Sequence, residues 1–544
     1  MSTTETSPPP DHLDSPVEND TGRLDGASRV RIFAILIVIV LYTEVVPLQY
    51  TMVSAALQKM TKTFSTVGGN INWAVIILGL VGAAATPLIG KASDAWGKKK
   101  LFLATGVCFF VGCVICALTS NWTIFLIGRG LAAFSIASQV VAYGLIRDLI
   151  PRKYIPLGVG MIGAGLGFSG AIAPLIGGFL VDHFEWRAMF WFLAAFTLML
   201  TPLVIWVVPE TKLRVRERFD PFGAILLSAG ALFTLLYLDN GQTWGWGRPS
   251  ALAWLIGGLV MLALFVVVEF RVSRPIMDMK LLVNPKVSLT LLMTAFGVGI
   301  TAVQPLALGY MTQTPNVDGL RENVVQGVVA QAHQMTGMTL PASLVHVNFD
   351  PGYTYGNGFS MLGYALHVGI WAGLLGMVVG PFAGAMARRL GARIPAILAF
   401  SILTISGIGF VVFHYSWITY LVLYLLAGIG FGCFYAAGPN LIMDAVPQEQ
   451  QGISAGMLGV TMSMGSAICM AVTTALLNNH PVKAHIDVMG HSTVQTIPQV
   501  FADRGYTLSF WVVLATTIVA LIIAVLMRHG RSPATGGAPV TSEA

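Results

Sequence analysis

The segment "LIRDLIPRKYIPLGVGMIG" (residues 145–163) recurs as "LIMDAVPQEQQGISAGMLG" (residues 441–459) at a constant offset of 296 residues. An aspartate, a proline, a methionine and two glycines coincide in the two copies. A second pair, "TPLIGKASDAWGKKK" (86–100) and "GPFAGAMARRLGAR" (380–393), shares its proline and glycine spacing at an offset of 294. Two matches at nearly one offset indicate that the chain consists of two similar halves.

The composition is that of a membrane protein. Apolar residues make up 55% of the 544 residues and charged residues only 10%, whereas a soluble domain carries about 25% charge. The mean hydropathy is +0.74. A membrane-spanning helix needs about 20 apolar residues, and the sequence holds fourteen such runs. We therefore predict an all-α membrane protein with fourteen transmembrane helices.

The repeat divides these helices into domains. We predict a six-helix bundle in residues 31–210, a second bundle in residues 286–528, and two inserted transmembrane helices with their linkers in residues 211–285. The polar residues 1–30 and 529–544 are predicted to be disordered tails. Membrane proteins built from two such halves place their substrate site near the midplane between them and work by alternating access.

Lysine and arginine predict the orientation. With the N-terminus inside, inner segments hold 23 of the 31 basic residues and outer segments hold 7. This bias predicts that both termini are cytoplasmic. Two outer loops are long, 313–358 and 478–506, and the first is either a polar spacer or a contact site for a partner on the outer side. The basic residues form no patch for nucleic acid, and the cysteines have no metal-binding spacing.

One acid, Glu44, lies near the middle of the first apolar run. A charged carboxylate at the membrane midplane costs at least about 2.5–3.5 kcal/mol. Glu44 is therefore either a neutral, hydrogen-bonded packing residue or a group that takes up and releases a proton.

The segment "GKASDAWGKKK" (90–100) resembles the loop between the second and third spans of the major facilitator superfamily, specifically of its fourteen-spanner drug/proton antiporter branch. Gly90, Asp94, Gly97 and Lys98 match that motif. The resemblance implies a major facilitator fold in a bacterial inner membrane and a conformational latch at Asp94. Asp148 and Asp444, at the inner ends of repeated spans, are assigned to the same latch. The alternative is that Asp94 is a solvated loop charge.

The segment "GMIGAGLGFSGAIAPLIGG" (160–178) resembles the antiporter motif of the fifth span. This resemblance implies export rather than import, and the alternative is ordinary packing of small residues. The motif residues are Gly160, Gly163, Gly167, Gly170, Pro174, Gly177 and Gly178.

Arg129, in "LIGRGLAAF", resembles the intramembrane arginine that this family associates with proton coupling. Alternatively, Arg129 has a purely structural role and pairs with a backbone carbonyl. The family usually carries an acid in the first span where this chain has Gln49, although Thr51 is kept. Glu44 lies five residues earlier and projects about 140° away from Gln49 on a helix. We expect Glu44 to exchange the proton, Arg129 to tune it, and His367 to be the next candidate.

The expected function is proton-driven export of lipophilic or amphipathic compounds such as drugs, with antibiotic resistance as its consequence. The proton gradient would be the energy source, without a cofactor, and the expected partners are the small substrate or a lipid and the surrounding membrane lipids. Alternatives are an exporter of an endogenous lipid, siderophore or metabolite, and a non-transporting receptor. No nucleotide loop or nucleophile–base arrangement suggests an enzyme. Substrate-cavity candidates are Gln49, Thr51, Gln139, Gln304, Tyr364, Phe434 and Tyr435.

Overall fold

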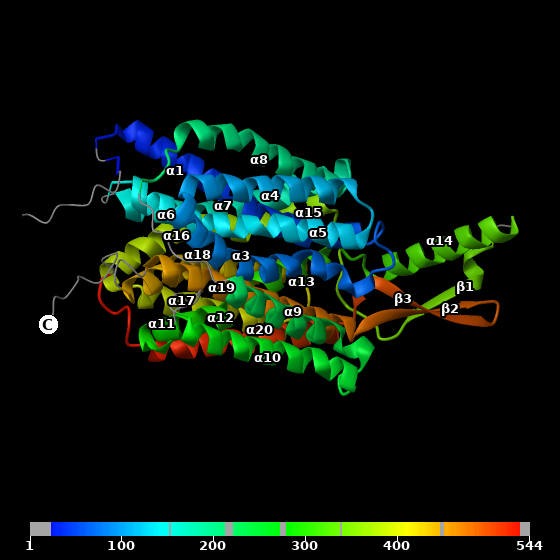
Figure 1. Cartoon of the computed structure of the whole chain (residues 1–544). Coiled ribbons are helices and arrows are strands. Elements are labelled where there is room, and N and C mark those ends of the chain that lie inside the picture. The colour runs from blue at the N-terminus through cyan, green and yellow to red at the C-terminus, as the bar shows by residue number, and fades with distance from the viewer. Residues whose placement is uncertain are drawn as a thin grey trace, which may run out of the picture.

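The computed structural model describes residues 23–24, 26–151, 154–212, 221–272, 279–337, 340–446 and 451–533. Long helices run side by side, and a small unit of one helix and three strands projects beyond them (Figure 1). We call the end of the bundle where α1 begins and α20 ends the terminal end. The opposite end, which carries the projecting unit, is called the loop end.

The first half of the bundle contains six spans. Its first span is bent into α1 and α2, and its fourth span is divided into α5 and α6 by a 3₁₀ turn at Ala133–Ile136. The helices are α1 (Arg29–Thr43), α2 (Val45–Met60), α3 (Trp73–Trp96), α4 (Lys98–Leu118), α5 (Trp122–Ala132), α6 (Ala137–Leu149), α7 (Ile155–His183) and α8 (Arg187–Val207).

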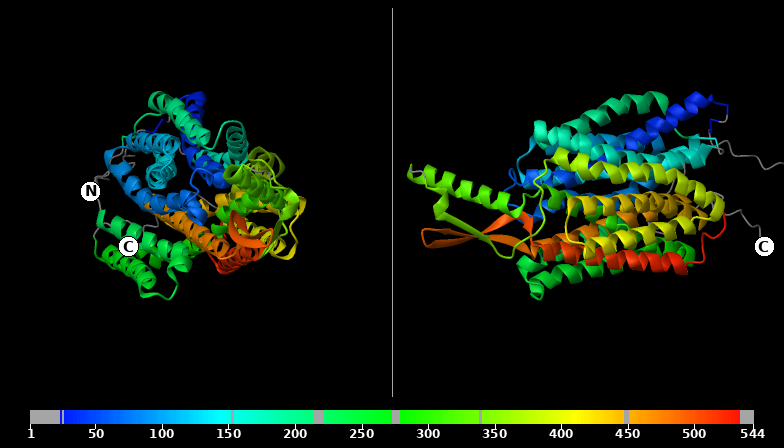
Figure 2. Two further views of the ribbon diagram at one scale, coloured as in Figure 1. Left: turned by 90° about the vertical axis from the view of Figure 1, so that its right-hand side faces the viewer. Right: turned by 180° about the vertical axis from the view of Figure 1, so that it is seen from behind.

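The second half repeats this arrangement after an insertion of two helices. The inserted α9 (Pro221–Trp244) and α10 (Pro249–Arg271) lie at the edge of the bundle, where α9 packs on helices of both halves (Figure 2). The remaining helices are α11 (Met279–Val283), α12 (Pro285–Gly297), α13 (Gly299–Gln313), α15 (Met361–Tyr364), α16 (Ile370–Leu390), α17 (Arg393–Val412), α18 (Trp417–Asp444), α19 (Gln451–Asn478) and α20 (Asp503–Leu526).

Twelve helical segments of the described chain are long and apolar enough to cross a membrane. Two further helices, α3 and α9, have shorter apolar stretches at Asn70–Gly82 and Ile225–Leu238. Both are 24 residues long and lie within the bundle. The all-α membrane fold is thereby confirmed, and α3 and α9 are the two helices that would complete a count of fourteen.

The sequence repeat has a structural counterpart at the terminal end. Gly97, between α3 and α4, has φ +119°, and Gly391, between α16 and α17, has φ +92°. A side chain rarely adopts such a φ, so the same tight turn requires glycine in both halves. Asp148 and Asp444 likewise lie at the terminal ends of α6 and α18.

The first span is broken at Glu44. Pro47 has no backbone N–H and cannot donate to the carbonyl of Thr43, so the helical ladder is interrupted here. Glu44 belongs neither to α1 nor to α2. The first span of the second half has a corresponding break at Val298, between α12 and α13. Both halves therefore begin with a bent helix.

The projecting unit combines the two long outer loops. α14 (Val317–Thr336) covers the loop segment whose apolar residues have helical spacing. β1 (Val345–Phe349) pairs antiparallel with β2 (Pro481–Val488), and β2 pairs with β3 (His491–Phe501). These strands were not predicted from the sequence, because β1 has only five residues and its partner lies in a different loop.

The predicted C-terminal tail, residues 529–544, starts too early in the chain, because its first residues still contact the bundle. His529 Nε2 lies 2.8 Å from the carbonyl oxygen of Leu441, and the carbonyl of Gly530 accepts a 3.0 Å hydrogen bond from the backbone N–H of Arg393. These contacts hold residues past the predicted boundary at residue 528 against the bundle. The first predicted tail lies mostly outside the described residues.

Candidate functional site

Glu44 is buried at the break of the first span, where its side chain is directed at α7. The residue is 3% exposed, and its Oε2 accepts a 2.5 Å hydrogen bond from Ser169 Oγ. Gly165, one turn earlier on α7, leaves room for the carboxyl group, since a Cβ there would lie 2.0 Å from Glu44 Oε1. The acid therefore docks on the helix that carries the glycine-rich motif.

The same helix forms a close contact with the second half. A Cβ on Gly167 would lie 2.5 Å from the backbone nitrogen of Met377, and one on Gly178 would lie 2.6 Å from Cα of Leu362. On the facing helix α16, a Cβ on Gly373 would lie 2.3 Å from the backbone nitrogen of Ala171. Glycines therefore allow backbone-to-backbone contact between the halves. Gly163 differs, because it faces open space.

Arg129 is fully buried in the first half and held by neutral groups. Its Nε donates to the carbonyl of Ala74 at 2.8 Å, and its Nη1 donates to Gln49 Oε1 at 3.3 Å. The guanidinium also lies over the ring of Phe190, 5.6 Å from the centroid. Gln49 in turn donates to Ser135 Oγ at 2.9 Å. Among the described side chains, no carboxylate forms an ion pair with Arg129.

Glu44 and Gln49 thus point in different directions, as their helical spacing predicted. Glu44 contacts α7, whereas Gln49 contacts Arg129 and Ser135. Gln49, at the position where the resemblance implied an acid, is thus a neutral amide that binds the arginine. No contact joins Arg129 to Glu44 in the described structure, so the expected tuning would have to be indirect.

The predicted latch residues partly come together at the terminal end. Lys98 Nζ lies 2.9 Å from Asp148 Oδ2, and both side chains are buried. Arg147 binds the other oxygen of Asp148 at 2.8 Å. Asp94 lies in the last turns of α3, but its side chain is outside the described part of the structure. Asp444 is the last residue of α18 and is half-buried.

Two further acids, which were not predicted from the sequence, accept hydrogen bonds from helix N-termini. Glu210 accepts hydrogen bonds from the backbone N–H groups of Lys99 and Lys100 at 3.0 and 3.2 Å, in the first turn of α4. Asp182, at the loop end of α7, accepts from the backbone N–H groups of Met361 and Leu362 at 3.2 and 2.7 Å. The Asp182 cap joins the two halves. In the sequence, the only sign of it was a single acid near the end of a span.

Other polar contacts also join the halves at the loop end. Gln58 donates to Thr314 Oγ1 at 3.1 Å. Tyr310 donates to Asn72 Oδ1 at 2.7 Å, and Asn72 donates to Thr474 Oγ1 at 3.0 Å. Together with Asp182, these residues close the loop end in the conformation that the structure describes.

The remaining predicted residues are spread through the bundle. His367 is exposed, lies 2.8 Å from the carbonyl of Gly363 and stacks on Phe359, outside the network around Glu44. Gln304, Tyr364 and Phe434 are buried, whereas Thr51, Gln139 and Tyr435 are half-buried. Phe434 contacts Tyr435 and Phe400, with ring centroids 5.1 and 5.7 Å apart. These rings form an aromatic cluster in the second half.

The described residues contain no group of three or more histidine, cysteine, aspartate or glutamate side chains that could hold a metal ion. All five cysteines are free, and four of them are buried. The Glu44–Ser169 pair, the Arg129 network and the Lys98–Asp148 pair are three buried polar groups of the described interior.

Comparisons with known proteins agree with this architecture. The solved peptide transporter POT in complex with sulfate superposes with a TM-score of 0.58 at 13% identity, over 91% of this chain and 94% of that one, which shows a shared fold. "Uncharacterized MFS-type transporter YvkA" of Bacillus subtilis (strain 168) is 28% identical over 251 residues, or 46% of this chain.

"Multidrug resistance protein Stp" of Mycobacterium tuberculosis (strain CDC 1551 / Oshkosh) is 24% identical over 439 residues, which cover 78% of this chain and 72% of that protein. The first curated relatives are matched over only about half of their length, 55% for YvkA. The model of one family, described as "Major Facilitator Superfamily", matches residues 40–318 and 324–543. This match covers nearly the whole bundle, and the chain therefore belongs to the Major Facilitator Superfamily.

Proposed function

We propose that this transporter is a proton-coupled exporter of lipophilic or amphipathic compounds, with Glu44 as the residue that exchanges the proton. The observation that carries this proposal is the 2.5 Å hydrogen bond between Glu44 and Ser169. It joins the buried acid of the first span to α7, the helix that packs most closely on the other half.

The physical reason is the cost of a charge in the membrane. A carboxylate at midplane is disfavoured by at least about 2.5–3.5 kcal/mol, so a closed, dry site favours the neutral acid. When water reaches Glu44 from one side, the charged form is solvated and the proton is released or taken up. The change of charge alters the bond to Ser169 and thereby the position of α7 against α16.

Alternating access supplies the rest of the cycle. The loop end is closed by Asp182, Gln58, Asn72 and Tyr310 in the described conformation. For export, these contacts must break so that cargo leaves at the loop end. The Lys98–Asp148 pair belongs to the region that would rearrange at the terminal end. The basic residues of the terminal segments support a cytoplasmic location of both termini.

The class of cargo is inferred from the apolar and aromatic character of the interior. Phe400, Phe434 and Tyr435 form an aromatic cluster that suits a lipophilic compound. The name of the Mycobacterium tuberculosis relative, a multidrug resistance protein, points the same way. An endogenous lipid, siderophore or metabolite is the second candidate, and it is favoured by the projecting unit of α14 and the strands, which could receive cargo or contact a partner at the loop end.

The test is transport in proteoliposomes under an imposed pH gradient, with a lipophilic dye and lumenal pH followed together. Glu44→Gln should abolish dye movement driven by the gradient while dye exchange without a gradient persists. Glu269→Gln is the matched control, because Glu269 is also a membrane acid that is only 2% exposed but lies on the inserted α10. Gradient-driven transport at the wild-type rate by Glu44→Gln would remove Glu44 from the mechanism.

A further inference from the structure

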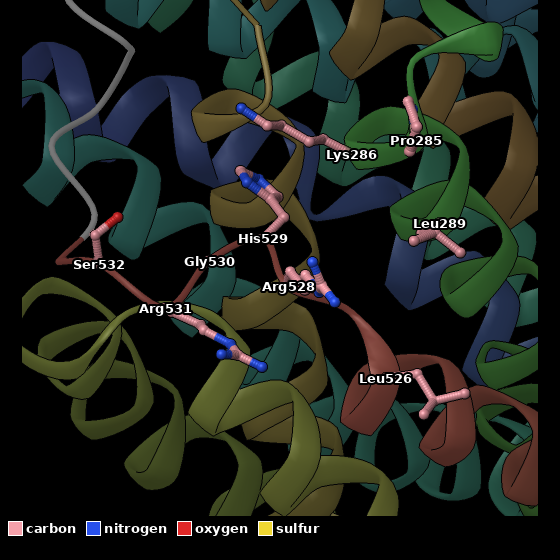
Figure 3. Close-up of a pocket in the computed structure, with 9 residues that line it drawn as sticks. All are labelled: Pro285, Lys286, Leu289, Leu526, Arg528, His529, Gly530, Arg531 and Ser532. Atoms are coloured by element: carbon pink, nitrogen blue, oxygen red, sulfur yellow. The ribbon is translucent and has the colours of Figure 1, made fainter.

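The terminal end of the second half contains a cavity of about 590 Å³ between the beginning of α12 and the end of α20. Residues Pro285, Lys286 and Leu289 of α12 form one wall, and Leu526 with residues 528–532 forms the other. Figure 3 shows the side chains of Lys286, Arg528 and Arg531 around the segment that follows α20, with Leu289 and Leu526 beside them. The cavity thus joins the first and last spans of this half.

The cavity is strongly basic. Lys286, Arg528 and Arg531 contribute three positive charges, and none of the nine described lining residues is acidic. All three side chains are exposed, and within the described residues none of them forms an ion pair. Three like charges so close together repel one another, and an anion bound among them would relieve this repulsion.

The wall formed by the residues after α20 is well fixed. Gly530 accepts a 3.0 Å hydrogen bond from the backbone of Arg393, while His529 lies 2.8 Å from the carbonyl oxygen of Leu441. Arg393 also donates from Nε to the carbonyl of Ala524 at 3.1 Å. These contacts place Arg528 and Arg531 on a short, anchored segment, so little backbone entropy would be lost when they bind a ligand.

The basic rim lies directly beside an apolar surface. On the last turns of α20, Ile522 and Leu526 are 50% and 73% exposed, and in a membrane this face meets acyl chains. Arg528 follows Leu526 by two residues, which places its charge where the span leaves the hydrocarbon. A ligand that fills this cavity must therefore be anionic at one end and apolar at the other.

We propose that this cavity binds the headgroup of an anionic glycerophospholipid, whose phosphodiester contacts Lys286, Arg528 and Arg531 while its acyl chains lie along α12 and α20. Basic pockets between transmembrane helices are the sites at which acidic lipid headgroups are held. The lipid would connect the first span of the second half to its last, and would thereby stabilise that half as a unit.

Binding is tested on the full-length protein purified in mild detergent. Native mass spectrometry counts retained lipids, and the thermal unfolding midpoint is followed with dioleoyl phosphatidylglycerol, dioleoyl phosphatidylcholine or inorganic phosphate. Wild-type protein should retain phosphatidylglycerol, and its midpoint should rise with that lipid but not with phosphatidylcholine. Each basic residue near a membrane surface contributes about 1 kcal/mol to binding anionic lipid, so Arg528→Gln with Arg531→Gln should weaken binding by about tenfold or more.

The matched control is Arg388→Gln with Arg389→Gln, which removes the same charge from the terminal end of α16, outside the cavity. This control should bind phosphatidylglycerol like the wild type. Lys286→Gln, at the exposed beginning of α12, is a second test if the double variant unfolds, and it should also weaken binding. The proposal is overturned if both double variants lose the lipid equally, if phosphatidylcholine binds as well, or if inorganic phosphate alone gives the full rise in midpoint.

Discussion

At the scale of single residues, the first span holds two polar side chains, Glu44 and Gln49, that have separate partners. Gln49 accepts a hydrogen bond from Arg129, whereas Glu44 accepts one from Ser169. The arginine and the acid are therefore held by separate networks. Proton exchange at Glu44 would not have to break a direct ion pair with Arg129.

Gly165→Ala should uncouple transport from the proton gradient. Its Cβ would lie 2.0 Å from Glu44 Oε1, so the carboxyl group must leave its position against Ser169. We expect gradient-driven dye transport in proteoliposomes to fall at least tenfold. Gly163→Ala, on the same helix but facing open space, should transport normally, and equal losses in both variants would contradict this prediction.

Asp148→Asn should destabilise the protein. The substitution leaves the buried Lys98 ammonium without its 2.9 Å carboxylate partner, and breaking a buried pair in this way costs about 3–5 kcal/mol. The measurement is the unfolding midpoint of the detergent-solubilised protein. Asp318→Asn breaks an exposed pair with Arg321 and should leave the midpoint unchanged. A midpoint for Asp148→Asn within error of the wild type would show that the buried pair contributes nothing.

At the scale of elements, α7 makes two sets of contacts. One face holds Glu44 through Ser169 and Gly165, and another contacts the second half through Gly167 and Gly178. We expect a change at the first face to reach the second, because both faces belong to one helix. The glycine-rich motif therefore has a structural role, because its small residues allow the backbones of the two halves to come into contact.

Gly167→Ala should impair the movement of the halves. Its Cβ would approach the backbone of Met377 to 2.5 Å, and a backbone cannot give way as a flexible side chain can. We expect transport to fall at least tenfold both with and without a pH gradient, unlike the selective loss in Glu44→Gln. Gly380→Ala, on α16 with no atom within 4 Å of the new Cβ, is the control. Retained transport in Gly167→Ala would mean that the halves separate at this contact without resistance.

At the scale of the whole molecule, the two halves meet differently at their two ends. The loop end is closed by hydrogen bonds that Gln58 and Asn72 donate and by those that Asp182 accepts from the backbone of the second half. At the terminal end, the buried Lys98–Asp148 pair lies within the first half. The described conformation is therefore closed at the loop end, and the proposed export would require this end to open.

A covalent link across the loop end should stop transport. Cysteines at Gln58 and Thr314, whose side chains are 3.1 Å apart, can be joined by a short, reducible bifunctional thiol reagent. We expect linkage to abolish transport and reduction to restore it. Cysteines at Ser120 and Arg187, which contact each other within the first half at the same end, should leave transport intact when linked. Undiminished transport by a fully linked Gln58–Thr314 pair would contradict alternating access at this end.

The sequence by itself determined the membrane fold, the two-half repeat, the bend near Pro47 and the different directions of Glu44 and Gln49. These features depend on apolar run length, on residue spacing and on the angle between successive helical residues, all of which are local. Glycine at 97 and 391 also follows from a local turn that requires a positive φ.

Only the tertiary structure decided which residues meet. Ser169 lies 125 residues from Glu44, and the backbone that Asp182 caps lies 179 residues further along the chain. β1 and β2 similarly come from two separate loops. Each of these contacts requires the helices to be packed first, because no sequence spacing fixes the distance between side chains on different spans. The cavity between α12 and α20 has the same origin, since its two walls are the first and last spans of one half.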